Sequence, residues 1–398
     1  MILNLKKSPK KFGALKPQTV HSMALDTLAV FYRLRLLRYY ARCLVPRRLD
    51  HDPFVSVVIA CPGRSWMLDE CLKAMDQQTY RDFEVILLPD EDIAAFEPSF
   101  STFHFPLHTH PTGKVRPAEK RNIGIREAKG EIVAFIDDDA YPDAHWLEYA
   151  VKYFGDQDIG AVGGPGVTPP GDGYMARLGG RVYDNFLVSG NYRYRYRAGG
   201  VRRDVDDYPS CNLFARTDLL RQIGGYRTDF WPGEDTLLCK DIVDSGHRIV
   251  YDPWIVVHHH RRSLFAPHLR QLGRYAFHRG YFVRRFPSNS AHFSYFVPSL
   301  FVLYLVAAAV LAAIPEPDCM PVWLFCAWHG FIAVPTLLYF ALVLLTTFAL
   351  NPATWLLTAL GVFATHIVYG VRFVQGLCAR RAPCEYIGVD HPGSSGQP

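Results

Sequence analysis

The sequence lacks any CxxC pair, and its nine cysteines stand singly without regular spacing. This pattern is typical of a reducing compartment in which the thiols stay free. A continuous apolar signal-peptide core is also missing near the N-terminus. We therefore expect the globular part of the chain to remain in the cytoplasm.

Charge is scarce as well, since 20% of the residues are charged while 49% are hydrophobic. Charged residues are scarce mainly in residues 293–377, whereas residues 51–290 have the composition of an ordinary globular domain. Within the apolar region, the spans 294–314, 321–348 and 353–377 each reach the roughly 20 residues that a helix needs to cross a bilayer. The sequence thus joins a globular domain to a C-terminal α-helical transmembrane segment of about three helices.

The charges that flank these spans predict which side of the membrane they face. The link at residues 315–321 carries acids but no Lys or Arg, which predicts an outside location. Arginines before the first span predict that the globular domain lies inside: Arg261, Arg262, Arg270, Arg274, Arg279, Arg284 and Arg285. Three full crossings would place the tail outside, although Arg372, Arg380 and Arg381 favour the inside. A re-entrant or interfacial last segment would remove this conflict, and the sequence leaves both arrangements open.

Positive charge is concentrated in residues 1–50, which carry eleven Lys or Arg and two Asp. Such a segment is attracted to anionic lipids or to nucleic acid. Because no nucleic-acid module is recognisable, we expect membrane lipids as the partner and no nucleic acid. Residues 24–45 predict an amphipathic helix, which we interpret as lying on the membrane. A helix packed on the globular domain is the alternative.

Strands and helices alternate in the globular region. The predicted elements are strands at 55–61, 83–88 and 131–136, and helices at 68–77, 120–128 and 146–154. This alternation predicts an α/β fold with a mainly parallel sheet that is covered on both faces. Ligands of such sheets bind at the carboxyl ends of the strands, where Pro62, Asp90 and Asp137–Asp139 fall.

The later elements are less regular. Residues 192–197 alternate strictly between Tyr and Arg, as an extended segment would, and residues 249–260 predict one further strand. Short elements are expected at 213–215, 217–223 and 237–245.

Asp137 and Asp139 follow a hydrophobic strand and share one side of it by alternation. Hard carboxylate oxygens at this spacing suit Mg²⁺ or Mn²⁺ bridging a diphosphate. An acidic loop at a strand end, without a metal, is the alternative.

An ordered series of motifs extends this observation over residues 54–285. In chain order they are VSVVIACPGR (55–64), FEVILLPD (83–90), PAEKRNIGIREAKGEIVAFIDDDA (117–140), PSCNLFARTDLLRQIGGY (209–226), GEDTLLCKDIVDSGHRI (233–249) and HHHRR (258–262). The series resembles the family-two glycosyltransferases of the GT-A fold, which include bacterial exopolysaccharide and cell-wall enzymes. The resemblance implies a Rossmann-like domain that transfers sugar from a nucleotide-diphosphate donor.

The resemblance also implies a donor site. Residues expected at the nucleotide sugar are Pro62, Gly63, Arg64, Asp90, Arg121, Asn122, Asp137 and Asp138. The metal, Mg²⁺ or Mn²⁺, would be held by Asp137, Asp139 and one closing histidine, for which we favour His259 over His260. The family commonly has two acids after the second strand, but Pro89 replaces the first here, which weakens any inference about the base.

Glu234 and Asp235 are the predicted catalytic pair, with Asp235 as the general base that deprotonates the acceptor hydroxyl. One carboxylate base with no second nucleophile suits direct displacement with inversion. An acidic pair that caps a helix is the alternative, and both roles can coexist. Leu237 stands where the family usually has a further acid.

These observations predict four segments: 1–50, a basic segment with the interfacial helix; 51–285, the GT-A domain; 286–378, the transmembrane helices; and 379–398, a polar tail. We expect an inverting, metal-dependent glycosyltransferase at the bacterial inner membrane that acts on a lipid-linked or glycan acceptor. The alternatives are a nucleotidyltransferase and a catalytically inactive membrane scaffold.

Overall fold

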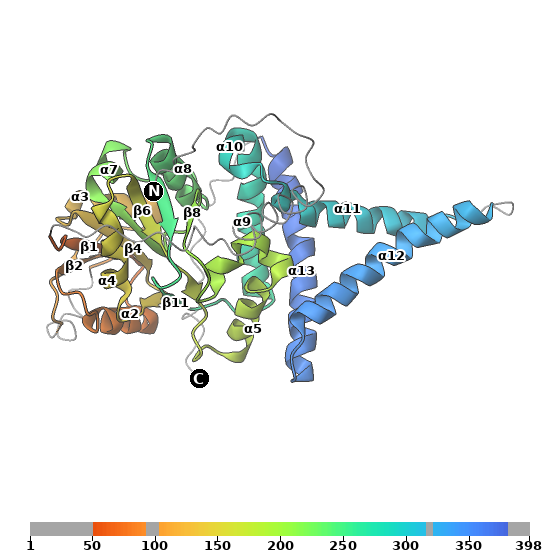
Figure 1. The fold of residues 1–398 in the computed structure, drawn as a ribbon, viewed down its shortest axis with the longest axis horizontal. Coiled ribbons are helices and arrows are strands. Elements are labelled where there is room, and N and C mark those ends of the chain that lie inside the picture. Colours follow the sequence, from red (N-terminus) through yellow and green to blue (C-terminus); the bar gives the residue numbers. More distant parts are fainter. Residues whose placement is uncertain (1–50, 93–102, 316–320, 381–398) are drawn as a thin grey trace, which may run out of the picture. The chain divides into compact units, whose positions relative to one another are not determined.

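Buried strands and polar turns alternate through the globular region, and a computed structural model shows how they fold (Figure 1). It describes residues 51–92, 103–315 and 321–380, so the helix expected at 24–45 lies outside the described residues. The chain divides into two units, Met1–Val45 and Pro46–Pro398, and all elements below belong to the second.

The strands of the described chain form two sheets. In chain order they are β1 (Val55–Ala60), β2 (Phe83–Leu88), β3 (Leu107–Thr109), β4 (Ile132–Asp137), β5 (Ala140–Pro142), β6 (Ile159–Gly163), β7 (Gly166–Val167), β8 (Arg203–Val205), β9 (Asn212–Arg216), β10 (Arg248–Tyr251) and β11 (Val257–His259). The large sheet has the order β3-β2-β1-β4-β9-β6-β10-β8, and the small one β5-β11-β7.

The helices cover these sheets or extend beyond them. They are α2 (Trp66–Asp76), α3 (Pro117–Glu127), α4 (Trp146–Val151), η4 (Lys152–Gly155), α5 (Tyr174–Tyr183), α6 (Phe186–Ser189), η5 (Gly190–Tyr196), α7 (Thr217–Gln222), α8 (Glu234–Asp244), α9 (Ala266–Arg285), α10 (Pro287–Ser290), α11 (Phe293–Ala313), α12 (Val322–Thr347) and α13 (Pro352–Cys378).

Strand β1 shows why the sheet is covered on both faces. Val57 packs into one hydrophobic cluster together with Leu68 of α2, whereas its neighbour Val58 packs into a second cluster with Ile125 of α3. Successive side chains of a strand point to opposite faces, so the apolar run from Val57 to Ala60 requires two cores. The predicted α/β fold with a mostly parallel central sheet is confirmed, with β1 parallel to β2 and β4.

Helix α3 lies close to the sheet because it carries a glycine at the contact. A Cβ on Gly124 would lie 2.4 Å from Cγ1 of Val58, which is shorter than real carbon contacts. Helix α2 begins where Ser65 caps it, since the Ser65 hydroxyl accepts a hydrogen bond from the Leu68 amide at 3.1 Å. The Gly124 approach sets how closely α3 packs on the sheet, and the Ser65 cap fixes the start of α2 just beyond the end of β1.

Two predicted extended segments differ from the structure. Residues 249–260 form two strands in different sheets, β10 and β11, because the chain turns at Asp252, whose carboxylate accepts a hydrogen bond from the Trp254 amide. Residues 192–197 largely form the 3₁₀ helix η5. There the Arg195 guanidinium lies 4.7 Å from the Tyr192 ring centroid. A 3₁₀ helix brings residues three apart together in this way, whereas an extended strand would hold them apart.

Three C-terminal helices, α11, α12 and α13, are long and apolar enough to cross a membrane. Their bounds lie within two residues of the spans predicted from the sequence. Helix α13 runs beside α9 of the globular region (Figure 1), and the two are joined by close backbone contacts at Gly280 and Gly376.

Candidate active site

Strand register brings the predicted residues to one edge of the large sheet. Ala60 of β1 pairs with both Leu88 of β2 and Asp137 of β4, so the three strands end side by side. The chain then turns from β4 into β5 through Asp138 and Asp139.

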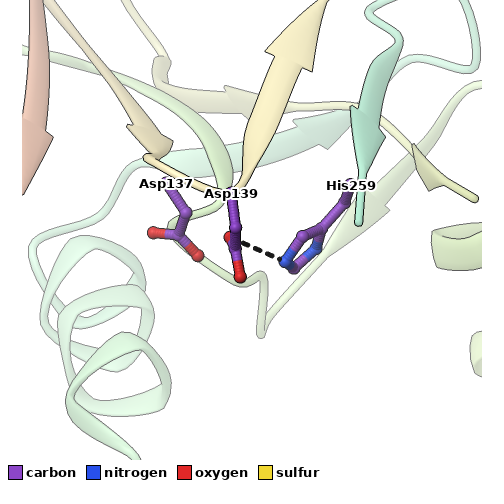
Figure 2. Close-up of side chains that lie close together, drawn as sticks. All are labelled: Asp137, Asp139 and His259. Atoms are coloured by element: carbon purple, nitrogen blue, oxygen red, sulfur yellow. Dashed lines mark ion pairs between the residues drawn. The ribbon is translucent and has the colours of Figure 1, made fainter. Parts of the chain in front are cut away.

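Three potential metal ligands converge beyond this edge (Figure 2). One ligand atom from each of Asp137, Asp139 and His259 lies within 4.8 Å of the other two. The Nε2 atom of His259 is 3.2 Å from Oδ1 of Asp139. The small sheet produces this arrangement, because β11 pairs with β5 so that His259 stands opposite Ala140, directly after Asp139.

The charge of His259 reflects its acidic surroundings. Burial lowers the pKa of the imidazole, but the Asp139 carboxylate more than offsets this effect and raises the pKa to about 10. Two carboxylates and one imidazole also form a ligand set that suits Mn²⁺ and, less typically, Mg²⁺. The residues therefore fit a divalent cation, which would replace the proton on His259.

The other two histidines of the run lie elsewhere. His258 stacks on the Tyr141 ring with centroids 4.8 Å apart. The imidazole of His260 lies between carboxylates, with Nδ1 at 2.5 Å from Asp172 and Nε2 at 2.8 Å from Glu70. Of the three, only His259 faces Asp137 and Asp139.

Asp138 does not share the open edge with its neighbours. Its side chain is buried, and burial together with Asp139 and Asp137 raises its pKa well above the usual range. Asp138 lies in the turn after β4 with its side chain buried, and its expected contact with the nucleotide sugar stays a prediction.

Arg121 connects the metal cluster to the predicted catalytic pair. Its Nη2 donates to Asp137 at 2.8 Å, while Nη1 donates to Glu234 at 3.2 Å and lies 3.8 Å from Asp235. The guanidinium is buried and forms ion pairs with all three carboxylates. Arg121 places one positive charge among three acids at the junction of β4, α3 and α8, and its expected place near the nucleotide stays a prediction.

Glu234 and Asp235 share the first turn of α8 but differ in exposure. The Asp235 side chain is 29% exposed and the Glu234 side chain 7%. Burial and the neighbouring Asp235 raise the pKa of Glu234 to about 7. Burial also raises the pKa of Asp235, although Arg121 and the Ser210 hydroxyl counteract it. Asp235 is the member of the pair that is open to a substrate.

Ser210 bonds Asp235 directly and Tyr226 does so through Ser210, and neither residue was predicted from the sequence. The Ser210 hydroxyl donates to Oδ1 of Asp235 and lies 2.6 Å from the Tyr226 hydroxyl. The Tyr226 ring in turn lies under the Arg121 guanidinium at 5.5 Å. The motifs PSCN and GGY that contain these residues were visible in the sequence, but nothing in it showed that they meet at α8.

Asp90 lies at the end of β2 beside a lysine that was also not predicted. The buried ammonium of Lys120 donates to Oδ1 of Asp90 at 2.5 Å, and to the backbone oxygens of Cys61 and Leu88. This cation fixes Asp90 at the shared strand edge. The sequence contained one signal for this role of Lys120, which is its position in the first turn of α3, the helix that begins at this edge of the sheet.

The remaining predicted donor residues fall into two groups. Pro62, Gly63 and Arg64 form the open turn after β1, where the Arg64 guanidinium pairs with Asp69 at 3.0 Å. Asn122 faces away, because both ends of its amide bond the backbone of Tyr226, at 2.7 and 2.8 Å. These bonds tie α3 to the backbone at Tyr226, and the expected contact of Asn122 with the nucleotide stays a prediction.

Glu234 and Asp235 also line a pocket of about 120 Å³. It lies between the start of α8 and the start of α9. Its polar lining is mostly basic apart from the two acids, and comprises Glu234, Asp235, Arg262, Arg270, Gln271, Arg274 and Tyr275. Such a pocket can hold a substrate with negative charge next to a carboxylate base.

The sequence was compared with protein families and with curated proteins. Residues 56–224 match the model described as "Glycosyl transferase family 2". Glycosyltransferase AglE of Haloferax volcanii is 27% identical over 209 residues, which cover 50% of this chain and 64% of that protein. Pre-mycofactocin glycosyltransferase of Mycobacterium tuberculosis is 30% identical over 160 residues, 39% of this chain and 32% of that protein.

A third relative, glucosyl-dolichyl phosphate glucuronosyltransferase of Haloferax volcanii, is 26% identical over 222 residues, which cover 52% of this chain and 68% of that protein. The chain thus spans less than two thirds of the first two relatives.

Among solved structures, the mannosyltransferase PcManGT from Pyrobaculum calidifontis superposes with a TM-score of 0.55 and 19% sequence identity. The alignment covers 89% of this chain and 99% of that one, and it supports the GT-A fold. Fold, motif order and family match agree: residues 56–224 match glycosyl transferase family 2, on a fold similar to that of a solved GT-A mannosyltransferase.

Proposed function

We propose that this protein is an inverting, metal-dependent glycosyltransferase that moves a sugar from a nucleotide-diphosphate donor to a lipid-linked acceptor at the membrane surface. The observation that carries the proposal is the juxtaposition at Arg121. This one guanidinium touches Asp137 of the metal cluster and, on its other side, Asp235 of the acceptor pocket.

The donor would lie along the strand edge. Asp137, Asp139 and His259 would hold Mn²⁺ or Mg²⁺, and the chemistry such an ion supplies is neutralisation of charge on the leaving diphosphate. PcManGT, which shares the fold, was solved with GDP-Man and Mn²⁺, and this supports a similar donor class here. Asp90, fixed by Lys120, would accept a hydrogen bond from the base or ribose.

Asp235 would act as the general base. It is the more exposed acid of the pair, it lines the pocket, and Ser210 and Arg121 fix its position. A carboxylate base suffices when the leaving group is already good, and a single base without a carboxylate nucleophile gives inversion. Glu234 would support Asp235 by fixing Arg121.

The acceptor would enter from the membrane side. The pocket beside Asp235 is lined by arginines of α9 and the segment before it, and guanidinium groups pair well with phosphate. One relative is named for glucosyl-dolichyl phosphate, a lipid phosphate. The apolar C-terminal helices would anchor the catalytic domain at the cytoplasmic face of a bacterial inner membrane.

The test is a donor panel incubated with the full-length, detergent-solubilised protein and Mn²⁺. We expect release of nucleoside diphosphate from one donor, and its loss after chelation with EDTA. Asp139→Asn should abolish metal-dependent donor binding in calorimetry. Asp235→Asn should keep donor binding but lower turnover by about 10²–10⁴-fold. Asp244→Asn, at the exposed end of the same helix α8, is the matched control and should change neither quantity.

Each alternative has its own outcome. Release of pyrophosphate from a nucleoside triphosphate would indicate a nucleotidyltransferase. No nucleotide released from any donor, with Asp235→Asn indistinguishable from wild type, would indicate an inactive scaffold.

A further inference from the structure

Helix α13 differs from the two apolar helices before it. In α11 and α12, 11% of the residues in the most apolar stretch are buried, whereas in α13 the share is 44%. A helix surrounded by lipid has few buried residues in a structure of the protein alone. The difference therefore shows that much of α13 is covered by protein rather than left for lipid.

The catalytic domain supplies part of this cover and contacts α13 from end to end. Helices α11 and α12 supply the rest, for example where the Ser299 hydroxyl of α11 donates to the Gly370 carbonyl at 3.0 Å. Near the start of α13, the Thr354 hydroxyl lies 3.0 Å from the Tyr174 hydroxyl of α5. In the middle, the His366 imidazole lies 2.9 Å from the Leu187 carbonyl of α6. At the end, Arg284 of α9 donates to the Leu377 carbonyl at 3.2 Å.

These contacts are difficult to reconcile with a helix that crosses the bilayer. A helix of 27 residues is about 40 Å long, more than the roughly 30 Å of a hydrocarbon core. If α13 crossed, its companion α9 would have to follow it through the bilayer. Helix α9 carries charge along its whole length: Arg270, Arg274, Arg279, Arg284 and Arg285. Charged side chains are strongly disfavoured in the bilayer core.

The contact between α9 and α13 is tight enough to keep them together. A Cβ on Gly280 of α9 would lie 2.1 Å from the Phe373 carbonyl oxygen, and a Cβ on Gly376 of α13 would lie 1.8 Å from the Phe277 carbonyl oxygen. Only glycine permits such backbone approach. The two helices therefore behave as one rigid pair.

The uncovered side of α13 is a narrow apolar stripe. Its large exposed side chains are Leu356 and Leu360 toward the start and Val371 and Val374 toward the end, and helical spacing places all four on one face. Between them Phe363 of the same face packs against Phe340 of α12, with ring centroids 5.7 Å apart. The opposite face, including Val362, Thr365 and Phe373, is buried. A helix with one apolar face toward lipid and the other on a polar domain matches the boundary between head groups and acyl chains.

We propose that α13 lies in the plane of the membrane surface, on the same side as the catalytic domain, with the Leu356–Val374 stripe in the outer acyl layer. Its partner is the lipid bilayer itself. Of the helices that the structure describes, α11 and α12 then make the crossings. The catalytic domain rests on the surface through the α9–α13 pair, which also places the pocket beside Asp235 close to the head groups.

The charges of the flanking segments agree with this topology. Residues 315–321 between α11 and α12 contain Glu316 and Asp318 but no Lys or Arg. Arg285 before α11 and Arg380 after α13 would lie together on the side that basic residues prefer. Three crossings would instead place Arg380 with the acidic segment.

Protease protection of the full-length chain in sealed vesicles of one orientation tests the topology without any assay of activity. An epitope tag is placed between Gly199 and Gly200 of the catalytic domain, between Asp318 and Cys319, or after Pro398. We expect the first and third tags to be digested in the same vesicles, and the second only after detergent is added. Digestion of the third tag together with the second, and not with the first, would overturn the proposal.

A pair of charge substitutions gives a second readout. Leu303→Lys places a cation at the centre of α11 and should reduce membrane-inserted protein at least tenfold. Leu360→Lys in the stripe of α13 should leave insertion within twofold of wild type, because a surface helix lets the ammonium reach the head groups. Equal loss in both variants would show that α13 crosses.

Discussion

At the residue scale, the site depends on one guanidinium, that of Arg121, which forms ion pairs with three carboxylates. Arg121 is buried between Asp137, Glu234 and Asp235, all of which would repel one another without it. Burying like charges is expensive unless a counter-charge is bound. The proposed catalytic pair and the proposed metal ligands are thus linked through one side chain that need not contact substrate.

Replacing this cation should damage both stability and function. Arg121→Gln leaves buried carboxylates unpaired, so we expect the free energy of unfolding to fall by about 3–5 kcal/mol. Donor binding should weaken with it, because Asp137 loses its partner. Denaturant unfolding in detergent measures the first effect and calorimetry the second. Arg126→Gln, exposed on the same helix α3, is the control and should stay within about 0.5 kcal/mol.

The raised pKa of Glu234 predicts a pH dependence of stability. Its folded-state pKa of about 7 lies above the ordinary value of 4.5, so the folded state favours the protonated form. The stabilisation from Glu234 should be complete below pH 4.5 and lost as pH rises through about 7. Glu234→Gln should remove this dependence from the melting temperature of the metal-free protein. A difference curve between wild type and variant that is flat from pH 4.5 to 8 would contradict it.

At the element scale, the start of α8 depends on a glycine in a left-handed conformation. Gly233 has φ of 118°, and a Cβ there would lie 2.4 Å from Cε2 of Phe282 on α9. Any side chain at this position must both strain the backbone and displace α9 from the acids that follow.

We therefore expect Gly233→Ala to lower stability by more than the roughly 1–3 kcal/mol of backbone strain alone, and to reduce turnover at least tenfold. Gly246, beyond the other end of α8, has φ of 90° and open space around it. Gly246→Ala thus carries the strain without the clash. Thermal unfolding of the two variants separates the effect of backbone strain from that of the clash with Phe282. An equal fall of the melting temperature in both variants would show that the Phe282 contact is unimportant.

Elements whose apolar pattern alone determines them were predictable from the sequence. The bounds of β2 were predicted to the residue, and β1, β4 and the three C-terminal helices to within two residues. Burial on both faces gives such strands a mostly apolar run, which local sequence displays directly. The predicted positions of Asp137 and Asp139 followed from β4 for the same reason.

Features that depend on distant contacts were not predictable in this way. The division of residues 249–260 into β10 and β11 depends on two separate sheets, and it is this division that brings His259 to Asp139. Asp138, Asn122 and Lys120 likewise acquire their roles from neighbours more than fifteen residues away or from burial. Residue type and spacing carry no signal for such partners.

At the scale of the whole molecule, the catalytic domain and the C-terminal helices share a hydrophobic core. Leu178, Val182 and Leu264 of the catalytic domain pack with Val343, Ala359 and Val362 of α12 and α13. A Cβ on Gly361 would also lie 2.8 Å from Val182. The helices are therefore packed into the same fold as the domain that contains the pocket.

This shared core predicts that the catalytic domain cannot simply be released by truncation. A chain ending at residue 290 exposes the covered faces of α5 and α9, and each uncovered large apolar side chain removes about 1.5–3 kcal/mol of stabilisation. We expect such a chain to aggregate, or to melt at least about 10 °C below the full chain in the same detergent. A chain ending at residue 380 keeps α13 and is the control, which should match the full-length protein. A monodisperse chain ending at residue 290 with an unchanged melting temperature would show that α9 is stable without α13, because its exposed face would then need no cover.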